Sequence, residues 1–445
     1  MTEGIRHLDA SLDVAPAPSV APAAAGVQVM AALRALPGTP LRTFLACLGV
    51  WTFVNLEQSM FGYAVPAMVQ DLALSIQTVG FIISLGFVVA IFGALTTGLL
   101  TDRLGRRTML ASCFGLSGLF YALQAFAGGG VGLGFARSAG AGLSAGLSPI
   151  TSSYVAEIAP PRIRALMVGF LQIGFPLGWF LASMLVVPLL ANNGWRAVFL
   201  VSLAAPVLAW LIHRTIPETA RFEAVKASAA HRRPLGEQVG ELFAPEFRRL
   251  TALAIVAFLT KGGAYAGLAF FLPTFLHDVR GYDAATSAYV VGLSYGIGIF
   301  GYISASIVGE FFLSRRTTIV IWSWSGAVAL LAFLWLPHTP IEDIVACGVM
   351  AIFSFGTSAI LTTFILEQFP TRMRATGASC ASASVSLGFA IFPIVVTSLG
   401  GPLGWQAAIS VCVAPLLILS GLSVLCMPSR ASVVEDEDIE MSGER

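Results

Sequence analysis

The chain has 445 residues, of which 56% are hydrophobic and only 11% are charged, and its net charge at pH 7 is +1. A soluble globular chain carries about 25% charged residues, and a mean hydropathy of +0.83 over this length cannot be hidden in a water-soluble core. The composition predicts a protein that crosses the membrane several times. The small net charge gives no reason to expect nucleic-acid binding.

Twelve apolar runs follow an N-terminal segment, residues 1–42, which is rich in Ala and Pro and is expected to be a disordered cytoplasmic tail. A membrane-spanning helix needs about 20 mostly apolar residues, and the runs are continuous rather than alternating, which favours helices over barrel strands. The sequence therefore predicts an all-α membrane protein with twelve transmembrane helices: 43–66, 77–100, 108–127, 130–156, 163–190, 196–212, 251–276, 286–313, 317–336, 343–366, 376–399 and 404–427.

Charge and repetition divide these helices into two halves of six. The charged segment 213–250 is expected to be a cytoplasmic linker between an N-terminal half, 43–212, and a C-terminal half, 251–427, with a cytoplasmic tail at 428–445. With the N-terminus inside, 21 of the 25 Lys and Arg fall on the cytoplasmic side and only Arg196 and Arg280 outside, as the positive-inside rule requires. This distribution predicts that both termini are cytoplasmic.

Two landmarks recur 210 residues apart. The segment "EIAPPRIRA" at 157–165 returns as "EQFPTRMRA" at 367–375, and the pair Gly194-Trp195 returns as Gly404-Trp405. Two unrelated landmarks at one offset predict two six-helix pseudo-repeats, an arrangement found among transporters.

The loop "GLLTDRLGRR" at 98–107 lies between the second and third expected helices, and a degraded copy, "GEFFLSRR", lies at 309–316. The loop resembles the signature loop of the major facilitator superfamily, and "PETARF" at 217–222 resembles the box after the sixth helix in its sugar porter, aromatic-acid:proton symporter and metabolite:proton symporter branch. The resemblance implies a secondary transporter in which two halves give alternating access to a central site.

The charged loops are candidates for a conformational gate. Asp102 can accept hydrogen bonds from helix ends or an Arg, and the Arg residues can pair with acids such as Glu157 or contact lipid phosphates. The alternative is that the Arg cluster only fixes topology. The candidate gate residues are Gly98, Asp102, Arg103, Gly105, Arg106, Arg107, Glu157, Arg164, Glu367 and Arg374.

Glu57 and Arg137 are expected at membrane depth, where an ionisable residue costs at least ~2.5–3.5 kcal/mol at the helix centre. A buried carboxyl can exchange a proton near neutral pH because desolvation disfavours its charged form. Glu57 in the first helix is thus a candidate for proton coupling. Arg137 in the fourth helix is a candidate partner, and a purely structural ion pair is the alternative.

Lys261 in the seventh helix is a candidate anion site. The second half shows no acid at membrane depth apart from Glu310 and Glu367 near its cytoplasmic ends, so the cation would be compensated by a substrate or by Glu57 across a cavity. A Lys that extends to the interface is the alternative. Arg137, Tyr265, Trp179 and Tyr295 are further candidates for substrate binding, although most aromatic side chains in spans face lipid or the core.

These features predict proton-coupled uptake of a small organic anion, such as an aromatic carboxylate, by a monomer in a bacterial inner membrane, with substrate, protons and lipid as its partners. The alternatives are a proton-driven exporter of drugs or metabolites and a transporter-like receptor. No CxxC pair, metal-ligand cluster, phosphate-binding loop or Ser/His/Asp set occurs in the sequence. We therefore expect neither an enzyme nor a metal or cofactor site.

Overall fold

The computed structural model describes residues 38–159, 164–218, 240–369 and 374–427, and within these ranges all regular elements are helical. The first half contains α2 (Gly38–Asp71), α3 (Ile76–Leu104), α4 (Arg106–Leu123), α5 (Gly130–Ser144), α6 (Leu147–Ile158), α7 (Arg164–Gln172), α8 (Gly174–Leu200) and α9 (Ala204–Thr215). The second half contains α12 (Arg248–Ala269), α13 (Leu272–Arg280), α14 (Ala284–Phe311), α15 (Arg315–Trp335), α16 (Pro340–Gly356), α17 (Ser358–Gln368), α18 (Arg374–Leu403) and α19 (Trp405–Leu425).

Several helices begin where a short polar side chain caps the first turn. Ser75, Asp283, Ser314 and Thr339 each accept a hydrogen bond from a backbone N–H at the start of α3, α14, α15 and α16. Such caps satisfy N–H groups that have no partner inside the helix. The local sequence therefore helps to fix where these four helices begin.

Five of the expected spans are each divided between two α-helices: the fourth (α5 and α6), the fifth (α7 and α8), the sixth (the end of α8 and α9), the seventh (α12 and α13) and the tenth (α16 and α17). Pro273 near the start of α13 explains one division, because proline has no N–H to continue the helix before it. By length and composition, nine helices in the described ranges can cross a membrane, and one of these stretches, Met167–Thr215, covers both the fifth and sixth expected spans.

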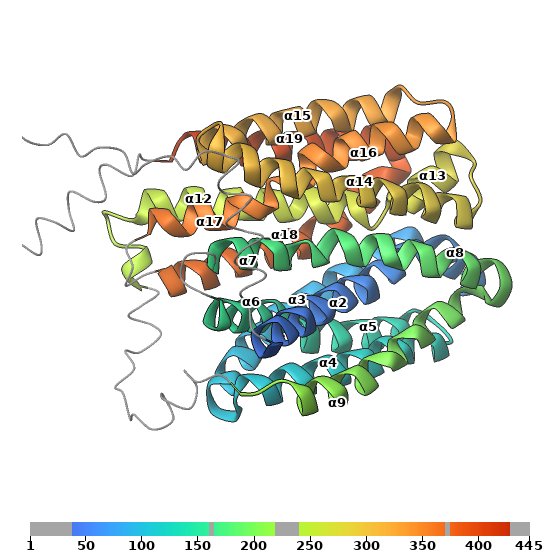
Figure 1. Cartoon of the computed structure of the whole chain (residues 1–445). Coiled ribbons are helices and arrows are strands. Elements are labelled where there is room, and N and C mark those ends of the chain that lie inside the picture. Colours follow the sequence, from blue (N-terminus) through green and yellow to red (C-terminus); the bar gives the residue numbers. More distant parts are fainter. Residues whose placement is uncertain (1–37, 160–163, 219–239, 370–373, 428–445) are drawn as a thin grey trace, which may run out of the picture. The chain divides into compact units, whose positions relative to one another are not determined.

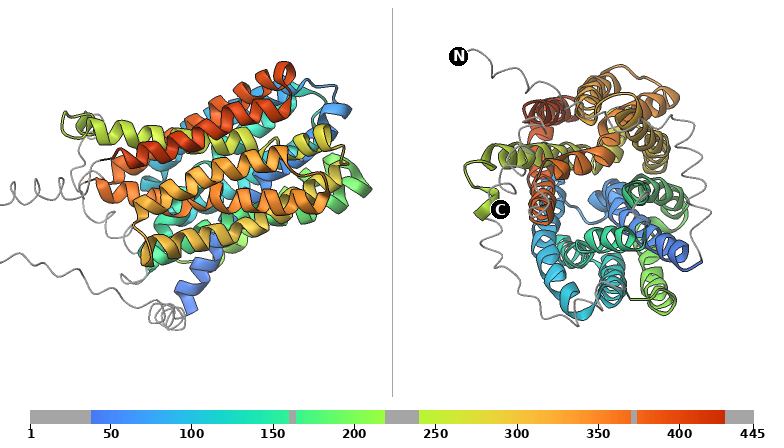
Figure 2. Two further views of the ribbon diagram at one scale, coloured as in Figure 1. Left: turned by 90° about the horizontal axis from the view of Figure 1, so that it is seen from above. Right: turned by 60° about the vertical axis from the view of Figure 1, so that its left-hand side comes forward.

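The two halves pack against each other along their helices (Figures 1 and 2). Contacts between the halves join α8 to α14 and α3 to α18. Glycines allow some of these approaches: a Cβ added to Gly62 on α2 would lie 3.3 Å from the Phe270 carbonyl oxygen, and one added to Gly296 on α14 would lie 3.1 Å from the Phe180 ring. Small residues at helix contacts are typical of membrane bundles.

The internal repeat is visible at the end of the bundle where α2 and α13 end. Gly194 and Gly404 both have positive φ, 74° and 76°, and each precedes a Trp whose indole N–H donates to an Asp. Trp195 donates to Asp71 at 3.1 Å and Trp405 donates to Asp278 at 3.0 Å. We refer to these two contacts as the Trp–Asp clamps, and they support the prediction of two related halves.

Candidate functional site

Aromatic side chains from both halves meet at the centre of the bundle. Trp179 on α8 stacks on Tyr295 of α14 with ring centroids 4.8 Å apart, and Tyr295 stacks on Phe355 of α16 at 5.3 Å. Tyr265 on α12 stands perpendicular to Trp179, with an interplanar angle of 89°, and also contacts Phe355. We call these four residues the central aromatic cluster.

Further aromatic residues border the central aromatic cluster, and three tyrosine hydroxyl groups make polar contacts there. Tyr63 donates a hydrogen bond to the Trp179 carbonyl, and the Tyr265 and Tyr295 hydroxyls lie 3.5 Å apart. The cluster is also bordered by Phe175, Phe270 and Phe389. The sequence prediction that Trp179, Tyr265 and Tyr295 lie near a common site agrees with this arrangement, whereas a role in binding substrate stays a prediction.

Lys261 lies one helical turn before Tyr265 on α12 and is buried, with 7% of its surface exposed. Its ammonium group donates to the Ser354 carbonyl and to the Thr357 hydroxyl, where α16 gives way to α17. The carboxyl end of a helix has carbonyl groups without helical partners and a negative dipole. This helix end therefore stabilises the buried cation.

A small cavity adjoins Lys261, with about 10 Å³ of space for the centre of a water molecule, room for about one water. Lys261, Ser354 and Tyr265 supply its polar lining, and the rest comes from Ala264, Leu268, Phe355, Val413 and Leu417. A cavity of this size is too small for an organic substrate.

Of the two compensators considered for Lys261, a substrate and Glu57, Glu57 is not its partner in this structure. Glu57 on α2 is 1% exposed and points toward α4, where its Oε1 lies 3.2 Å from the place of a Cβ on Gly118. Ser202 is its polar side-chain neighbour, although neither carboxylate oxygen of Glu57 reaches hydrogen-bond geometry with a described residue. Lys261 instead has its hydrogen-bond partners, Ser354 and Thr357, on its own half.

Arg137 on α5 is also buried but does not form an ion pair with Glu57. Its guanidinium lies 4.0 Å from the centre of the Phe61 ring and 5.5 Å from that of Phe270 on the other half, and its Nε and Nη1 have no partner among the described residues. Tyr121 on α4 interacts electrostatically with both Arg137 and Glu57. The two charged residues therefore share a neighbour rather than a direct contact.

Ion pairs close the end of each half where α6 and α17 end, which we call the charged end. Arg106 pairs with Glu157 in the first half, and Arg315 pairs with Glu367 at 2.5 Å in the second. The two pairs are equivalent: in each half, the first Arg of an Arg-Arg sequence pairs with a Glu. That Glu directly follows the fourth expected span in the first half and the tenth in the second. Of the other candidate gate residues, Gly98 lies in α3 and Gly105 separates α3 from α4.

Glu218, which lies in the "PETARF" segment, was not among the predicted gate residues. Its carboxylate accepts hydrogen bonds from the backbone N–H groups of Arg106 and Arg107 at 3.0–3.2 Å, at the start of α4, where a negative charge is favourable. The side chains of Asp102, Arg103, Arg164 and Arg374 lie outside the described parts of the chain.

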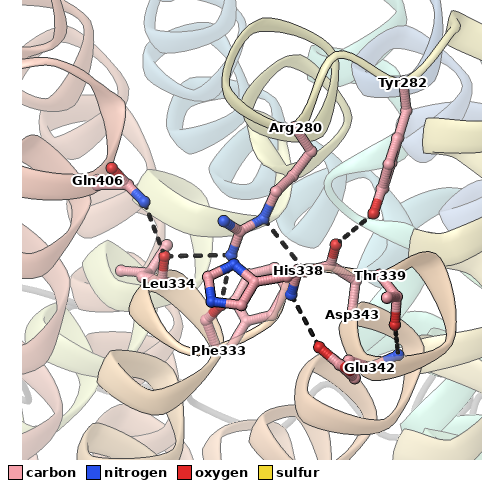
Figure 3. Close-up of polar contacts among 9 residues, drawn as sticks. All are labelled: Arg280, Tyr282, Phe333, Leu334, His338, Thr339, Glu342, Asp343 and Gln406. Carbon is pink, nitrogen blue, oxygen red and sulfur yellow. Dashed lines mark hydrogen bonds and ion pairs between the residues drawn. The ribbon is translucent and has the colours of Figure 1, made fainter.

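At the opposite end, a polar network surrounds Arg280 (Figure 3). Its guanidinium donates to the Phe333 and Leu334 carbonyls and lies 3.4 Å from Asp343, which also accepts from the Tyr282 hydroxyl at 2.8 Å. Burial, together with Asp343, raises the pKa of Tyr282 to about 12. Asp343 is fully buried in the first turn of α16, at the end of the bundle rather than at mid-membrane depth, and it was not singled out from the sequence.

Comparison with known proteins identifies the family. The sequence model of the Major Facilitator Superfamily matches residues 43–379 of this chain. The chain belongs to this superfamily. It is therefore an integral membrane transporter and not an enzyme, as the sequence predicted.

Curated relatives within the superfamily are bacterial transporters. The chain is 30% identical over 396 residues to the 3-(3-hydroxy-phenyl)propionate transporter of Escherichia coli, a match that covers 87% of this chain and 94% of that protein. It is 28% identical over 383 residues to the niacin transporter NiaP of Acinetobacter baylyi, covering 80% and 86%. It is 24% identical over 419 residues to the 4-hydroxybenzoate transporter PcaK of Pseudomonas aeruginosa, covering 86% and 92%.

Solved structures of the superfamily share the fold. The D-xylose-proton symporter matches with a TM-score of 0.71 and 18% identity, over 88% of this chain and 99% of that one. A bacterial homologue of the lysosomal transporter Spinster in an inward-facing state matches with a TM-score of 0.67 and 18% identity, over 87% and 95%. At these identities the similarity concerns the fold alone.

Proposed function

We propose that this superfamily member takes up a small aromatic carboxylate together with protons. The observation that carries the proposal is the buried cation of Lys261 one turn from the central aromatic cluster. A cation with three N–H donors can bind a carboxylate, and stacked or perpendicular rings are favourable surroundings for a planar ring. The names of the relatives, which transport hydroxylated aromatic acids and niacin, support the same substrate class.

The substrate site forms when the halves move apart. Trp179 belongs to the first half, whereas Tyr265, Tyr295 and Phe355 belong to the second, so separating the halves divides the central aromatic cluster. A ring then enters between Trp179 and the second half, with its carboxylate directed to Lys261. Arg137, whose guanidinium approaches Phe270 on the second half, is a second candidate for the anion.

Glu57 is the proposed proton-coupling residue, and Arg137 its electrostatic neighbour. A buried carboxylate without a hydrogen-bond partner is costly, whereas its protonated form is not. Glu57 is thus suited to binding and releasing a proton as access alternates. Because Tyr121 interacts with both residues, movement of Arg137 on substrate binding would change the electrostatic environment of Glu57.

The charged end is the proposed gate, including Asp102, Arg103, Arg164 and Arg374 together with the ion pairs described above. Pairs that form in one state and break in the other bias a two-state equilibrium. We further propose the expected division into tails, two halves and the 213–250 linker, with the charged end and both termini on the cytoplasmic side of a bacterial inner membrane, and a monomer as the functional unit.

Uptake into proteoliposomes tests the proposal. Radiolabelled nicotinate and its uncharged analogue nicotinamide form a matched pair, to be measured beside 4-hydroxybenzoate under an inward proton gradient. We expect accumulation of one or both acids and not of the amide. Accumulation of the amide alone, or of none of a broad panel of aromatic acids, would contradict the proposed substrate class.

A second arm tests Lys261. Truncating one partner of a buried charge pair typically costs 2–5 kcal/mol, so Lys261→Met should lower uptake by about 30-fold or more. Arg249→Met removes an exposed cation from the same helix and should transport like the wild type. Equal uptake by the two variants would exclude Lys261 as the anion site.

A further inference from the structure

The tenth expected span, which supplies the two partners of Lys261, is interrupted at a single residue, Thr357. α16 ends at Gly356 and α17 begins at Ser358, and the N–H of Thr357 bonds to the Phe355 carbonyl. In an uninterrupted helix the Ser354 carbonyl would accept the N–H of Ser358, four residues on. Here the Lys261 ammonium donates to that carbonyl.

The first half shows that such an interruption does not require a lysine. Its fourth span is divided at Ala145 and Gly146, between α5 and α6, and Trp51 lies at the position 210 residues before Lys261. Backbone hydrogen bonds continue there, from Ala145 to Ala141 and from Ile150 to Gly146. Lys261 is thus an addition specific to the second half and not a general support of the fold.

The docked position of the ammonium is too confined for a carboxylate. The adjoining cavity holds about one water, and apart from Lys261, Ser354 and Tyr265 its walls are apolar. A substrate anion must therefore meet the ammonium after it has swung away from Ser354 and Thr357. The long, flexible lysine side chain permits this movement, and Tyr265 shows that the same face of α12 reaches the rings of the first half.

We propose that Lys261 keeps the interruption between α16 and α17 in place in the empty carrier, with Thr357 as its positioning residue, and that a bound anion releases it. The inference rests on the proposed role of Lys261 as the anion site. Once the ammonium leaves, the Ser354 carbonyl can accept the Ser358 N–H, and α17 aligns with α16. α17 carries Glu367, the partner of Arg315, and contacts α7 of the first half, so the substrate acts on the charged end through α17.

Substitution of Thr357 tests the competition between protein and substrate for the ammonium. Thr357→Val keeps the shape but removes the acceptor, so the docked state is weakened and the anion no longer competes with it. We expect the acid that the wild type binds, with 4-hydroxybenzoate as the first probe, to bind about tenfold tighter, which corresponds to about 1.4 kcal/mol. Turnover should fall, because the ammonium returns to its docked position less readily.

Two controls separate this effect from a general loss of packing. Thr357→Ser retains the hydroxyl and should restore the wild-type affinity and turnover. Thr260→Val removes another buried hydroxyl from the neighbourhood of Lys261, one that bonds only to carbonyls of its own helix, and should leave the affinity unchanged. Unchanged or weaker binding by Thr357→Val, measured by isothermal titration, would overturn the inference.

A second measurement does not depend on the folding of the Thr357 variants. Spin labels at the exposed Thr317 and Thr362, in a cysteine-free background, report the distance between α15 and α17. Saturating acid should change this distance in a protein that retains Lys261 and should not change it in Lys261→Met. Binding of acid without a distance change would overturn the inference alone, whereas absence of binding by every acid tested would overturn the proposed function as well.

Discussion

The two glycines of the Trp–Asp clamps permit a quantitative test of the repeated architecture. Gly194 has φ 74° and ψ 174°, and Gly404 has φ 76° and ψ 158°, a region of backbone space that only glycine adopts readily. An alanine Cβ would meet no atom within 4 Å at either site. The cost of Gly→Ala is therefore backbone strain alone, about 1–3 kcal/mol per site.

The two sites lie in different halves and should act independently, so the double variant should lose the sum of the two single losses, within ~0.5 kcal/mol. Gly129→Ala is the matched control, because its φ of 175° is extended backbone and its Cβ would also meet nothing within 4 Å. That substitution should be neutral or stabilise by up to about 1 kcal/mol through the unfolded chain.

Unfolding titrations of the purified variants in mixed micelles measure these differences. Equal stability of Gly194→Ala and Gly129→Ala would refute the strain argument. A double variant no less stable than either single variant would refute the independence of the two clamps.

Three further outcomes are expected. Glu57→Gln should abolish uphill uptake driven by a proton gradient while downhill exchange continues, because only the titrating group is lost; normal accumulation under a pH gradient would exclude this role. Glu367→Gln removes the partly exposed ion pair with Arg315, which is worth about 0.2–1 kcal/mol. This variant should change turnover by up to about fivefold with little change in substrate affinity. Equal losses in substrate binding and turnover would argue against a gate. The hydrogen bond from Arg196 lowers the pKa of Asp71, so its stabilising contact is present above the unfolded-state pKa and is lost as pH falls through the folded-state pKa. The stability difference between wild type and Asp71→Asn should therefore shrink as the pH is lowered into the acid range, and a difference that does not shrink would contradict this.

Much of the fold was predictable because lipid imposes simple rules on sequence. Apolar runs of sufficient length located the helices, and the Gly-Trp repeat at 194–195 and 404–405 located equivalent turns. The boundary between α16 and α17 was not predictable, since threonine and serine are common within helices and Thr357 itself has helical φ and ψ, −60° and −23°. Pro273, by contrast, was a local sign of a helix boundary that the pattern of apolar residues obscured.

The candidate site was only partly predictable for a similar reason. An intramembrane Lys261 is conspicuous in any apolar run, but its partners are a backbone carbonyl and a threonine hydroxyl nearly 100 positions away, which no charge pattern indicates. Arg137 and Lys261 were both considered as partners of Glu57, whereas the rotation of α2 directs its carboxylate to Gly118. Asp343 and Glu218 each lie beside the start of a helix, where an acid is common because it stabilises the helix dipole. For this reason neither residue was singled out from the sequence.

The distribution of polar contacts has a consequence for how the chain is made. Every hydrogen bond and ion pair described above lies within one half: the Trp195–Asp71 clamp, the Arg106–Glu157 pair and the Glu218 contacts all involve residues before 219. Domains generally fold from the N-terminus during synthesis. The first six spans can thus complete these contacts while the ribosome is still translating the rest. The later spans then form their own polar contacts, such as the Trp405–Asp278 clamp and the Arg315–Glu367 pair, and pack their rings and glycines against a half that is already assembled.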